Sequence, residues 1–219
     1  MEDEERIRRI HEDLLDVYEE PERSETADGV EVLVETILSQ NTNDINRDKA
    51  YRNLQDRYDS WEDVEEAPED ELTDVVRVAG LGPTKAERIQ KALQLVREET
   101  GGDYSVDFLD EMSTEDAKDW LESLPGVGPK TAAIVLCFHM GRAVFPVDTH
   151  VHRLSKRWGM VPENASRRKT HDIMERKVPD DLKYTLHILM IRHGRNDCEA
   201  RNPTHDTKIR KWCSAYEEK

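Results

Sequence analysis

Apolar residues recur along this chain at the three- and four-residue intervals of amphipathic helices. The first such stretch carries Ile7, Ile10 and Leu14, and the second is the run VEVLVETILSQ after Gly29. These intervals place the apolar side chains on one face of a helix, where they can pack together. No segment alternates apolar and polar residues over the length of a strand between hairpin turns. The sequence therefore predicts an all-α protein, built as a compact array of many short helices.

The composition favours a folded protein without disulfide bonds. Hydrophobic residues make up 36% of the 219 residues, which is enough chain to bury a core of its own. The three cysteines, Cys137, Cys198 and Cys213, are too few for a secreted disulfide framework. The opening residues MEDEERIRRI are acidic, and no stretch has the length and apolar character of a membrane span. We expect a soluble cytoplasmic monomer that does not contact a membrane.

The charge is strongly negative overall but unevenly distributed. The formal net charge is −16, which by itself would repel the phosphates of a nucleic acid. Residues 124–170, however, carry eight basic side chains against two acidic ones, Asp148 and Glu163. This segment predicts a local cationic face for DNA, although an ordinary solvated helix face is the alternative. The acidic surplus elsewhere suggests a halophilic protein adapted to high internal salt, and an ordinary acidic cytosolic protein is the alternative there.

A turn rich in glycine separates two predicted helices near residues 114–140. The turn reads LPGVGPKT over residues 124–131, and Ser113 with Asp116 forms a capping box before the first helix. The two glycines allow a tight turn and a close approach to a phosphate, and Pro129 suits the first turn of a helix. The N–H groups at that helix start would face a DNA phosphate. The motif predicts a helix-hairpin-helix, with a simple tight turn between helices as the alternative.

A second polar motif follows Lys130 after eighteen residues. Asp148 begins the run DTHVHRL, and it stands where a helix reaching Trp158 would begin. An aspartate at that position accepts hydrogen bonds from the first N–H groups of the helix. For Asp148 taken alone, a purely structural helix cap is the alternative to a functional role.

These motifs together resemble the endonuclease III family of helix-hairpin-helix DNA glycosylases. The resemblance rests on LPGVGPKTA, on its spacing to VDTHVHRL, and on the later HGR at residues 193–195. The segments ILSQNTND and AGLGPTKAERI extend it over nearly the whole chain. It implies a six-helix domain at residues 25–145 and a second helical domain formed by residues 1–24 and 146–219. DNA would lie between them, with the active site at the interdomain cleft.

The resemblance also implies a base-excision repair enzyme that acts on double-stranded DNA containing damaged bases or abasic sites. Lys130 matches the family's nucleophilic lysine and Asp148 its aspartate, and relatives without the lysine lack efficient lyase activity. An amine that adds to C1′ of the sugar displaces the base and leaves a Schiff base, which permits strand cleavage by β-elimination. We expect a bifunctional DNA glycosylase and abasic-site lyase for oxidised pyrimidines. A glycosylase for mismatched or alkylated bases and a non-catalytic DNA-binding protein are the alternatives.

A damaged base must leave the duplex to reach such a site, so other residues must hold the gap open. By resemblance, Gln40 fills the vacated position and Leu81, at the tip of a Gly-Leu-Gly turn, acts as an apolar wedge. The structural alternatives are a polar helix end for Gln40 and a buried loop anchor for Leu81. The residues expected to bind DNA are Gln40, Leu81, Gly126, Val127, Gly128, Thr131, His150 and Arg153.

The C-terminal segment departs from the family pattern. Members often carry an iron–sulfur cluster on four cysteines with the spacing C-x₆-C-x₂-C-x₅-C. Counted from Cys198, the other three positions hold His205, Lys208 and Ser214. Cys213 lies one residue too early, which leaves Cys198, His205 and Cys213 as an incomplete ligand set. We expect no [4Fe–4S] cluster and no other cofactor, with zinc at the incomplete set as the alternative.

Overall fold

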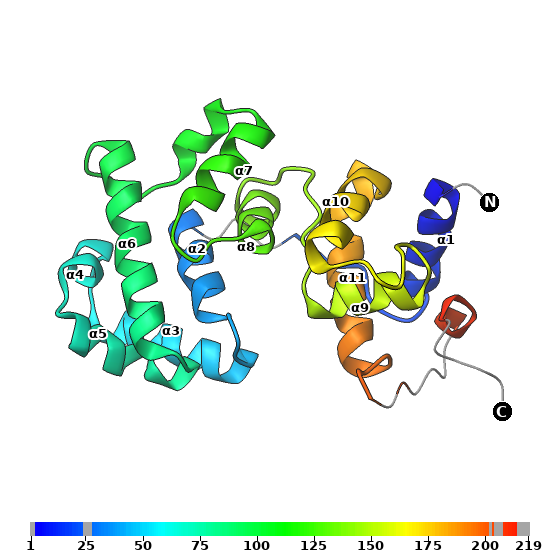
Figure 1. The fold of residues 1–219 in the computed structure, drawn as a ribbon, viewed down its shortest axis with the longest axis horizontal. Coiled ribbons are helices and arrows are strands. Elements are labelled where there is room, and N and C mark those ends of the chain that lie inside the picture. The colour runs from blue at the N-terminus through cyan, green and yellow to red at the C-terminus, as the bar shows by residue number, and fades with distance from the viewer. Residues whose placement is uncertain (1–2, 24–27, 202, 204–207, 214–219) are drawn as a thin grey trace. The chain divides into compact units, whose positions relative to one another are not determined.

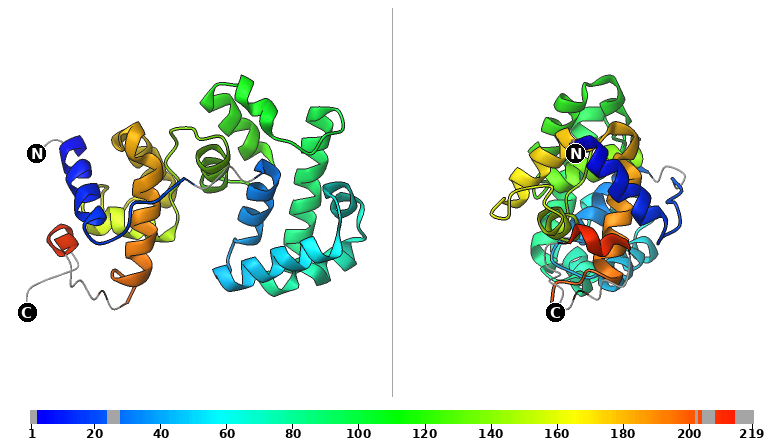
Figure 2. Two further views of the ribbon diagram at one scale, coloured as in Figure 1. Left: turned by 180° about the vertical axis from the view of Figure 1, so that it is seen from behind. Right: turned by 90° about the vertical axis from the view of Figure 1, so that its right-hand side faces the viewer.

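The computed structural model describes residues 3–23, 28–201, 203 and 208–213, and all regular secondary structure within them is helical (Figure 1, Figure 2). This confirms the all-α expectation. The chain divides into two compact units, one formed by Met1–Ser24 with Arg142–Lys219 and the other by Glu25–Gly141. Among the described helices, none is both long and apolar enough to cross a lipid bilayer.

The unit Glu25–Gly141 is organised around α6, its longest described helix. Helices α2, α4 and α5 pack against α6, and α3 packs against α2 and α5 (Figure 1). The apolar faces of these helices form the core of the unit. The helices are α2 (Gly29–Leu38), α3 (Asp44–Arg57), α4 (Trp61–Glu66), α5 (Glu69–Val76), α6 (Gly82–Thr100), α7 (Thr114–Ser123) and α8 (Pro129–Ile134). Two 3-10 turns, η1 (Arg77–Ala79) and η2 (Asp107–Glu111), and a π-helical continuation of α8, η3 (Val135–His139), complete it.

Helices in this unit begin where the sequence supplies a capping side chain. Asp28, Asn43 and Ser60 each accept a hydrogen bond from a backbone N–H in the first turn of α2, α3 and α4. Ser113 caps α7 in the same way. Each bond satisfies an N–H group that the helix itself leaves unpaired. Helix α6 ends at Gly101, which adopts a φ of +74°, a backbone angle that favours glycine.

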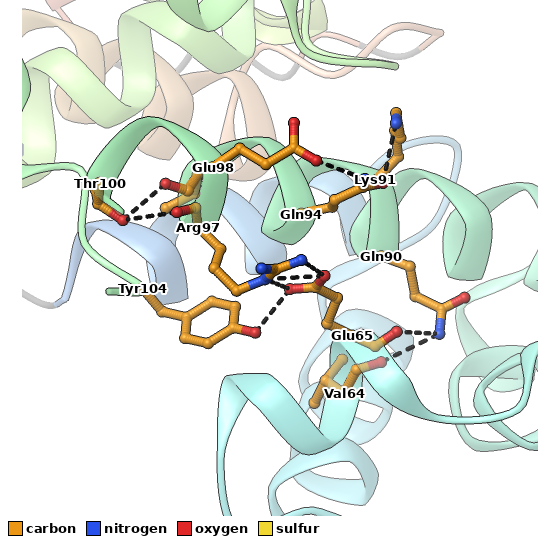
Figure 3. Close-up of polar contacts among 10 residues, drawn as sticks. Val64, Glu65, Gln90, Lys91, Gln94, Arg97, Glu98, Thr100 and Tyr104 are labelled. Carbon is orange, nitrogen blue, oxygen red and sulfur yellow. Dashed lines mark hydrogen bonds and ion pairs between the residues drawn. The ribbon is translucent and has the colours of Figure 1, made fainter. Parts of the chain in front are cut away.

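A largely buried carboxylate attaches α4 to α6 (Figure 3). Glu65 accepts hydrogen bonds from Nη2 of Arg97 at 2.9 Å and from the hydroxyl of Tyr104 at 2.7 Å. The hydrogen bond from Arg97 is the main cause that lowers the pKa of Glu65. The side-chain amide of Gln90 on α6 also donates to the backbone carbonyls of Val64 and Glu65. Because a helix as short as α4 is unstable alone, these contacts hold it in place.

The other unit joins the N-terminal helix to the C-terminal part of the chain. Ile7, Ile10 and Leu14 on α1 are buried in one apolar core with Trp158. Helix α11 packs against both α1 and α9, as the views from opposite sides show (Figure 1, Figure 2). The first amphipathic stretch of the sequence therefore closes a core made mainly by distant residues. The elements are α1 (Asp3–Leu15), α9 (Thr149–Arg157), α10 (Arg167–Lys177), η4 (Asp180–Leu182), α11 (Lys183–Asn196) and η5 (Lys208–Trp212).

Candidate functional site

The glycine-rich turn joins α7 to α8 and has the helix-hairpin-helix arrangement that the sequence predicts. Gly126 has a φ of +78°, and a side chain added to it would collide with Arg88, whose Cδ would lie 2.4 Å from the new Cβ. Both the backbone angle and this close approach favour glycine. Val127 is only 6% exposed, so it anchors the turn in the core rather than presenting a side chain to solvent. Helix α8 then begins at Pro129.

Lys130 is the second residue of α8 and directly follows the turn. Its side chain is partly exposed, whereas Thr131 is 4% exposed and belongs to the core. The backbone of Gly128 is extended, and the space beside its Cα is open. The N–H groups at a helix start have no acceptor within the helix and carry a partial positive charge. The turn therefore offers an approach for a phosphate next to the amine-bearing residue.

Gln40 lies just after the end of α2 and is held against the hairpin. Its Nε2 donates to the backbone carbonyl of Gly126 at 2.8 Å, and Nη1 of Arg88 donates to its Oε1 at 2.7 Å. The side-chain amide is thus oriented by two specific partners from α6 and the hairpin turn. These contacts bring the segment ILSQNT to the hairpin.

Leu81 lies at the exposed tip of the turn between η1 and α6. Its side chain is 55% exposed, and its φ is +53°, a backbone conformation that non-glycine residues rarely adopt. Holding a leucine in this conformation costs about 1–2 kcal/mol. The exposed side chain is not a buried loop anchor, which removes the structural alternative for this residue. Ile45, at the start of α3, is the other large apolar side chain that is strongly exposed among the described residues.

Asp148 caps α9, and its Oδ1 accepts a hydrogen bond from the backbone N–H of Val151 at 2.7 Å. The segment that precedes Asp148 is buried and is held by side chains from α10 and α11. Oε2 of Glu175 accepts from the backbone N–H of Phe145 at 2.7 Å. Nδ1 of His187 lies 2.9 Å from the carbonyl of Pro146, so it donates the proton there.

A buried ion pair completes this support. The ammonium of Lys183, a residue only 6% exposed, bonds the carbonyl of Ala143 and Oε1 of Glu175, both at 2.9 Å. Asp180 lies 3.0 Å away on the same ammonium. Burial opposes the charged form of Lys183, but the hydrogen bonds to Glu175 and then Asp180 outweigh it and raise its pKa. The backbone leading to the Asp148 carboxylate is therefore held at Ala143, Phe145 and Pro146.

Arg153 and His150, both expected to bind DNA, lie together on α9. Nη2 of Arg153 donates to the carbonyls of Gly194 at 2.8 Å and Cys198 at 3.0 Å, and it lies 3.1 Å from Nδ1 of His150. A side chain on Gly194 would come within 2.9 Å of Cβ of His150, so this glycine lets α11 approach α9 closely. The guanidinium of Arg153 thus links α9 to the end of α11. A direct contact of Arg153 or His150 with DNA stays a prediction.

The cysteine set does not fit a four-cysteine cluster. Cys198 and Cys213 are both buried in the core of one unit, and hydrogen bonds from Cys213, His193 and Arg157 hold the pKa of the Cys198 thiol below its usual range. Cys137 is buried in the other unit. His205, expected as a third ligand, lies outside the described residues. Within the part of the chain that the structure describes, no group of three or more His, Cys, Asp or Glu side chains is arranged to hold a metal ion.

Sequence reasoning missed several residues that support these loops, notably Lys85, Arg88, Glu175 and His187. Lys85 had a detectable signal, because it falls at helical spacing with Ile89 and therefore on the buried face of α6. The others carry no comparable signal, since their partners are side-chain and backbone groups brought near only by tertiary packing.

Comparisons with known proteins identify the family of the chain. Residues 34–180 match the family model of the HhH-GPD superfamily base excision DNA repair protein. The chain is 38% identical to a putative DNA glycosylase of Arabidopsis thaliana over 176 residues. This aligned region covers 80% of this chain and 59% of that relative. It is 33% identical to endonuclease III of Thermotoga maritima over 183 residues, and this aligned region covers 84% of this chain and 81% of that relative.

A solved structure of a trapped endonuclease III–DNA covalent intermediate has a TM-score of 0.82 at 26% identity, over 97% of this chain and 96% of that one. These matches confirm the expected fold and the expected type of protein, a base-excision DNA glycosylase. The chain belongs to the HhH-GPD superfamily of base-excision DNA repair proteins and, within it, resembles endonuclease III.

Proposed function

We propose that this glycosylase removes a damaged base from double-stranded DNA and then cleaves the strand at the resulting abasic site. The observation that carries the proposal is the position of Lys130, a partly exposed lysine in the first turn of α8 directly after the hairpin. The structural relative trapped as a covalent intermediate with DNA supports the same reading. A binding module that only contacts phosphate would need the hairpin but not the lysine.

In the proposed reaction the neutral amine of Lys130 is the nucleophile. A bond forms between Nζ and C1′ of the sugar as the bond from C1′ to the base breaks, and the base leaves with the electron pair. Loss of the amine proton and opening of the sugar ring give a Schiff base. Removal of a proton from C2′ then expels the 3′ phosphate, which cleaves the strand. The Asp148 carboxylate stabilises the positive charge that develops on the sugar and assists proton transfer.

The DNA contacts are proposed around this reaction. Gln40 fills the position that the flipped nucleotide vacates, and Leu81 enters the stack as a wedge. Gly126, Val127, Gly128 and Thr131 form the proposed phosphate site at the hairpin, and His150 and Arg153 contribute from α9. Oxidised pyrimidines are the proposed substrates. The chain has three cysteines, one fewer than a four-cysteine iron–sulfur cluster uses, and the proposed reaction has no step that involves such a cluster.

Borohydride trapping tests the proposal. The purified protein should form a covalent complex with DNA that contains an abasic site, because borohydride reduces the Schiff base at Lys130. Lys130→Gln should abolish trapping and strand cleavage while DNA binding persists, since the hairpin backbone is unchanged. Asp148→Asn keeps a side chain that can cap α9 but removes its charge, so base release should fall by orders of magnitude with the fold preserved.

The matched control is Lys156→Gln, which removes another partly exposed lysine outside the hairpin. This variant should trap DNA like the unmodified protein. Trapping that survives in Lys130→Gln would identify a different nucleophile. An unmodified protein that neither traps nor cleaves abasic DNA would exclude the lyase activity.

A further inference from the structure

Lys85 is a buried lysine that no step of the proposed chemistry uses. Its side chain is 1% exposed, and it lies in the first part of α6. Its Nζ donates to the backbone carbonyl of Leu38 at 2.7 Å and to that of Ala79 at 2.8 Å. Lysine is almost never fully buried unless its charge is satisfied by specific partners. The two carbonyls are such partners, and their places in the chain indicate what the lysine does.

The two carbonyls occupy equivalent places relative to the residues proposed to enter DNA. Leu38 is the last residue of α2 and precedes Gln40 by two positions, while Ala79 is the last residue of η1 and precedes Leu81 by two. A single ammonium therefore links the backbones of both segments just before their DNA-facing side chains. The backbone N–H of Lys85 also donates to the carbonyl of Leu81 at 3.0 Å.

Arg88, one turn further along α6, fixes the side chain of Gln40 itself. Its Nη1 donates to Oε1 of Gln40, and the amide of Gln40 donates in turn to the carbonyl of Gly126. Lys85 and Arg88 thus hold the ends of α2 and η1 and the hairpin turn against one face of α6. The shared ammonium thus links the Gln40 and Leu81 segments in addition to the packing of α2 and η1 against α6.

This arrangement is unfavourable for the lysine. Burial, and then the nearby positive charge of Arg88, lower the pKa of Lys85 to about 8. An apolar side chain of similar length would avoid the desolvation of an ammonium at this position, but it would leave the carbonyls of Leu38 and Ala79 without that donor. What an apolar side chain cannot do is donate to two carbonyls on two different segments.

We propose that Lys85 is a positioning residue for the insertion of Gln40 and Leu81 into the DNA duplex. It holds the two segments that carry these side chains at the separation required for them to enter together. This inference rests on the proposed roles of Gln40 and Leu81. It predicts a defect at the opening of the duplex rather than at the sugar. The effect should therefore depend on whether the lesion is base-paired.

The test replaces Lys85 by methionine, which has similar length but no charge or donor. Lys91→Met is the matched control, since Lys91 lies on the same helix, is exposed, and bonds only the side chain of Gln94 among the contacts in Figure 3. Base release is measured in single turnovers on duplex and single-stranded DNA carrying the same lesion. Lys85→Met should slow the duplex reaction about tenfold or more and leave the single-strand rate unchanged, whereas Lys91→Met should change neither.

Two further measurements separate positioning from folding. The thermal midpoint of Lys85→Met should fall by about 5–10 °C, because two buried carbonyls lose their donor and removal of the buried charge offsets only part of that loss, but the variant should remain folded at the assay temperature. A 2-aminopurine beside the lesion should show less unstacking in the complex with Lys85→Met. If Lys85→Met does not fold, Lys85→Gln, whose amide still donates, should show a smaller duplex-selective loss.

The outcomes distinguish this inference from its premises. Failure of the unmodified protein to release bases would overturn the proposed function itself. A duplex-selective loss in Leu81→Ala but not in folded Lys85→Met or Lys85→Gln would overturn the positioning role alone. Equal slowing of both substrates by either Lys85 variant would also overturn it, since that result indicates a general structural role.

Discussion

Leu81→Ala tests whether the exposed leucine acts on DNA or on the fold. With 55% of the residue exposed, roughly half of the side chain contributes to folding. Full burial of a leucine stabilises by about 1.5–3 kcal/mol, so truncation should cost about 1 kcal/mol of unfolding free energy. For a chain of this size that lowers the thermal midpoint by about 2–4 °C. The backbone strain at this position is the same in the unmodified protein and in Leu81→Ala, so it does not contribute to the difference.

The effect on duplex processing should be larger. Burying the exposed half of Leu81 between base pairs would contribute about 1–1.5 kcal/mol, which corresponds to about a tenfold change in rate. Single-turnover base release from duplex DNA should therefore fall about tenfold, while release from a single-stranded substrate should be unchanged. Ile45→Ala is the control, because Ile45 is 77% exposed and has no proposed role in insertion. Equal losses on both substrates, or an equal duplex effect in Ile45→Ala, would refute the reasoning.

Four further predictions concern stability and metal content. Glu175→Ala leaves the buried Lys183 without its main partner, so thermal unfolding should show a loss of about 3 kcal/mol, and an unchanged midpoint would argue against a stabilising role for this ion pair. The lowered pKa of Glu65 means that its contribution to stability is full above the ordinary glutamate pKa and is lost as pH falls through the folded value. Unfolding curves of Glu65→Gln and the unmodified protein should therefore differ at neutral pH and converge as the pH falls below the lowered pKa of Glu65. Elemental analysis should find no stoichiometric iron, and finding it would require ligands beyond Cys198 and Cys213. If the acidic surface reflects salt adaptation, stability should rise in molar potassium chloride even though DNA affinity falls with salt, and salt-independent unfolding would contradict that reading.

The parts of the fold predicted from sequence are those set by local chemistry. The hairpin followed from residues whose backbone preferences are strong, such as Gly126 and Pro129, and the cap at Asp148 followed from its position before a helix. Helical spacing placed Lys85 on the buried face of its helix, but its carbonyl partners on Leu38 and Ala79 were not predictable, because every residue carries such a group. The backbone N–H of Phe145 that donates to Glu175 was not predictable for the same reason. Those groups become specific partners only after helices distant in sequence have packed. The internal bonds of Arg153 show the same limit, since sequence indicated a basic surface residue and the structure uses it to join two helices.

The packing of α1 with the C-terminal helices has a consequence for biosynthesis. The unit Glu25–Gly141 is continuous in sequence, so it can fold while the ribosome is still adding later residues. The other unit cannot complete its core at that stage, because α1 must wait for α9 and α11 to be synthesised. Until then the apolar face of α1, with Ile7, Ile10 and Leu14, has no native partner and is exposed to aggregation or to chaperones. The rest of that helix carries charged side chains of both signs, which favour the solubility of the segment until its partners have been synthesised.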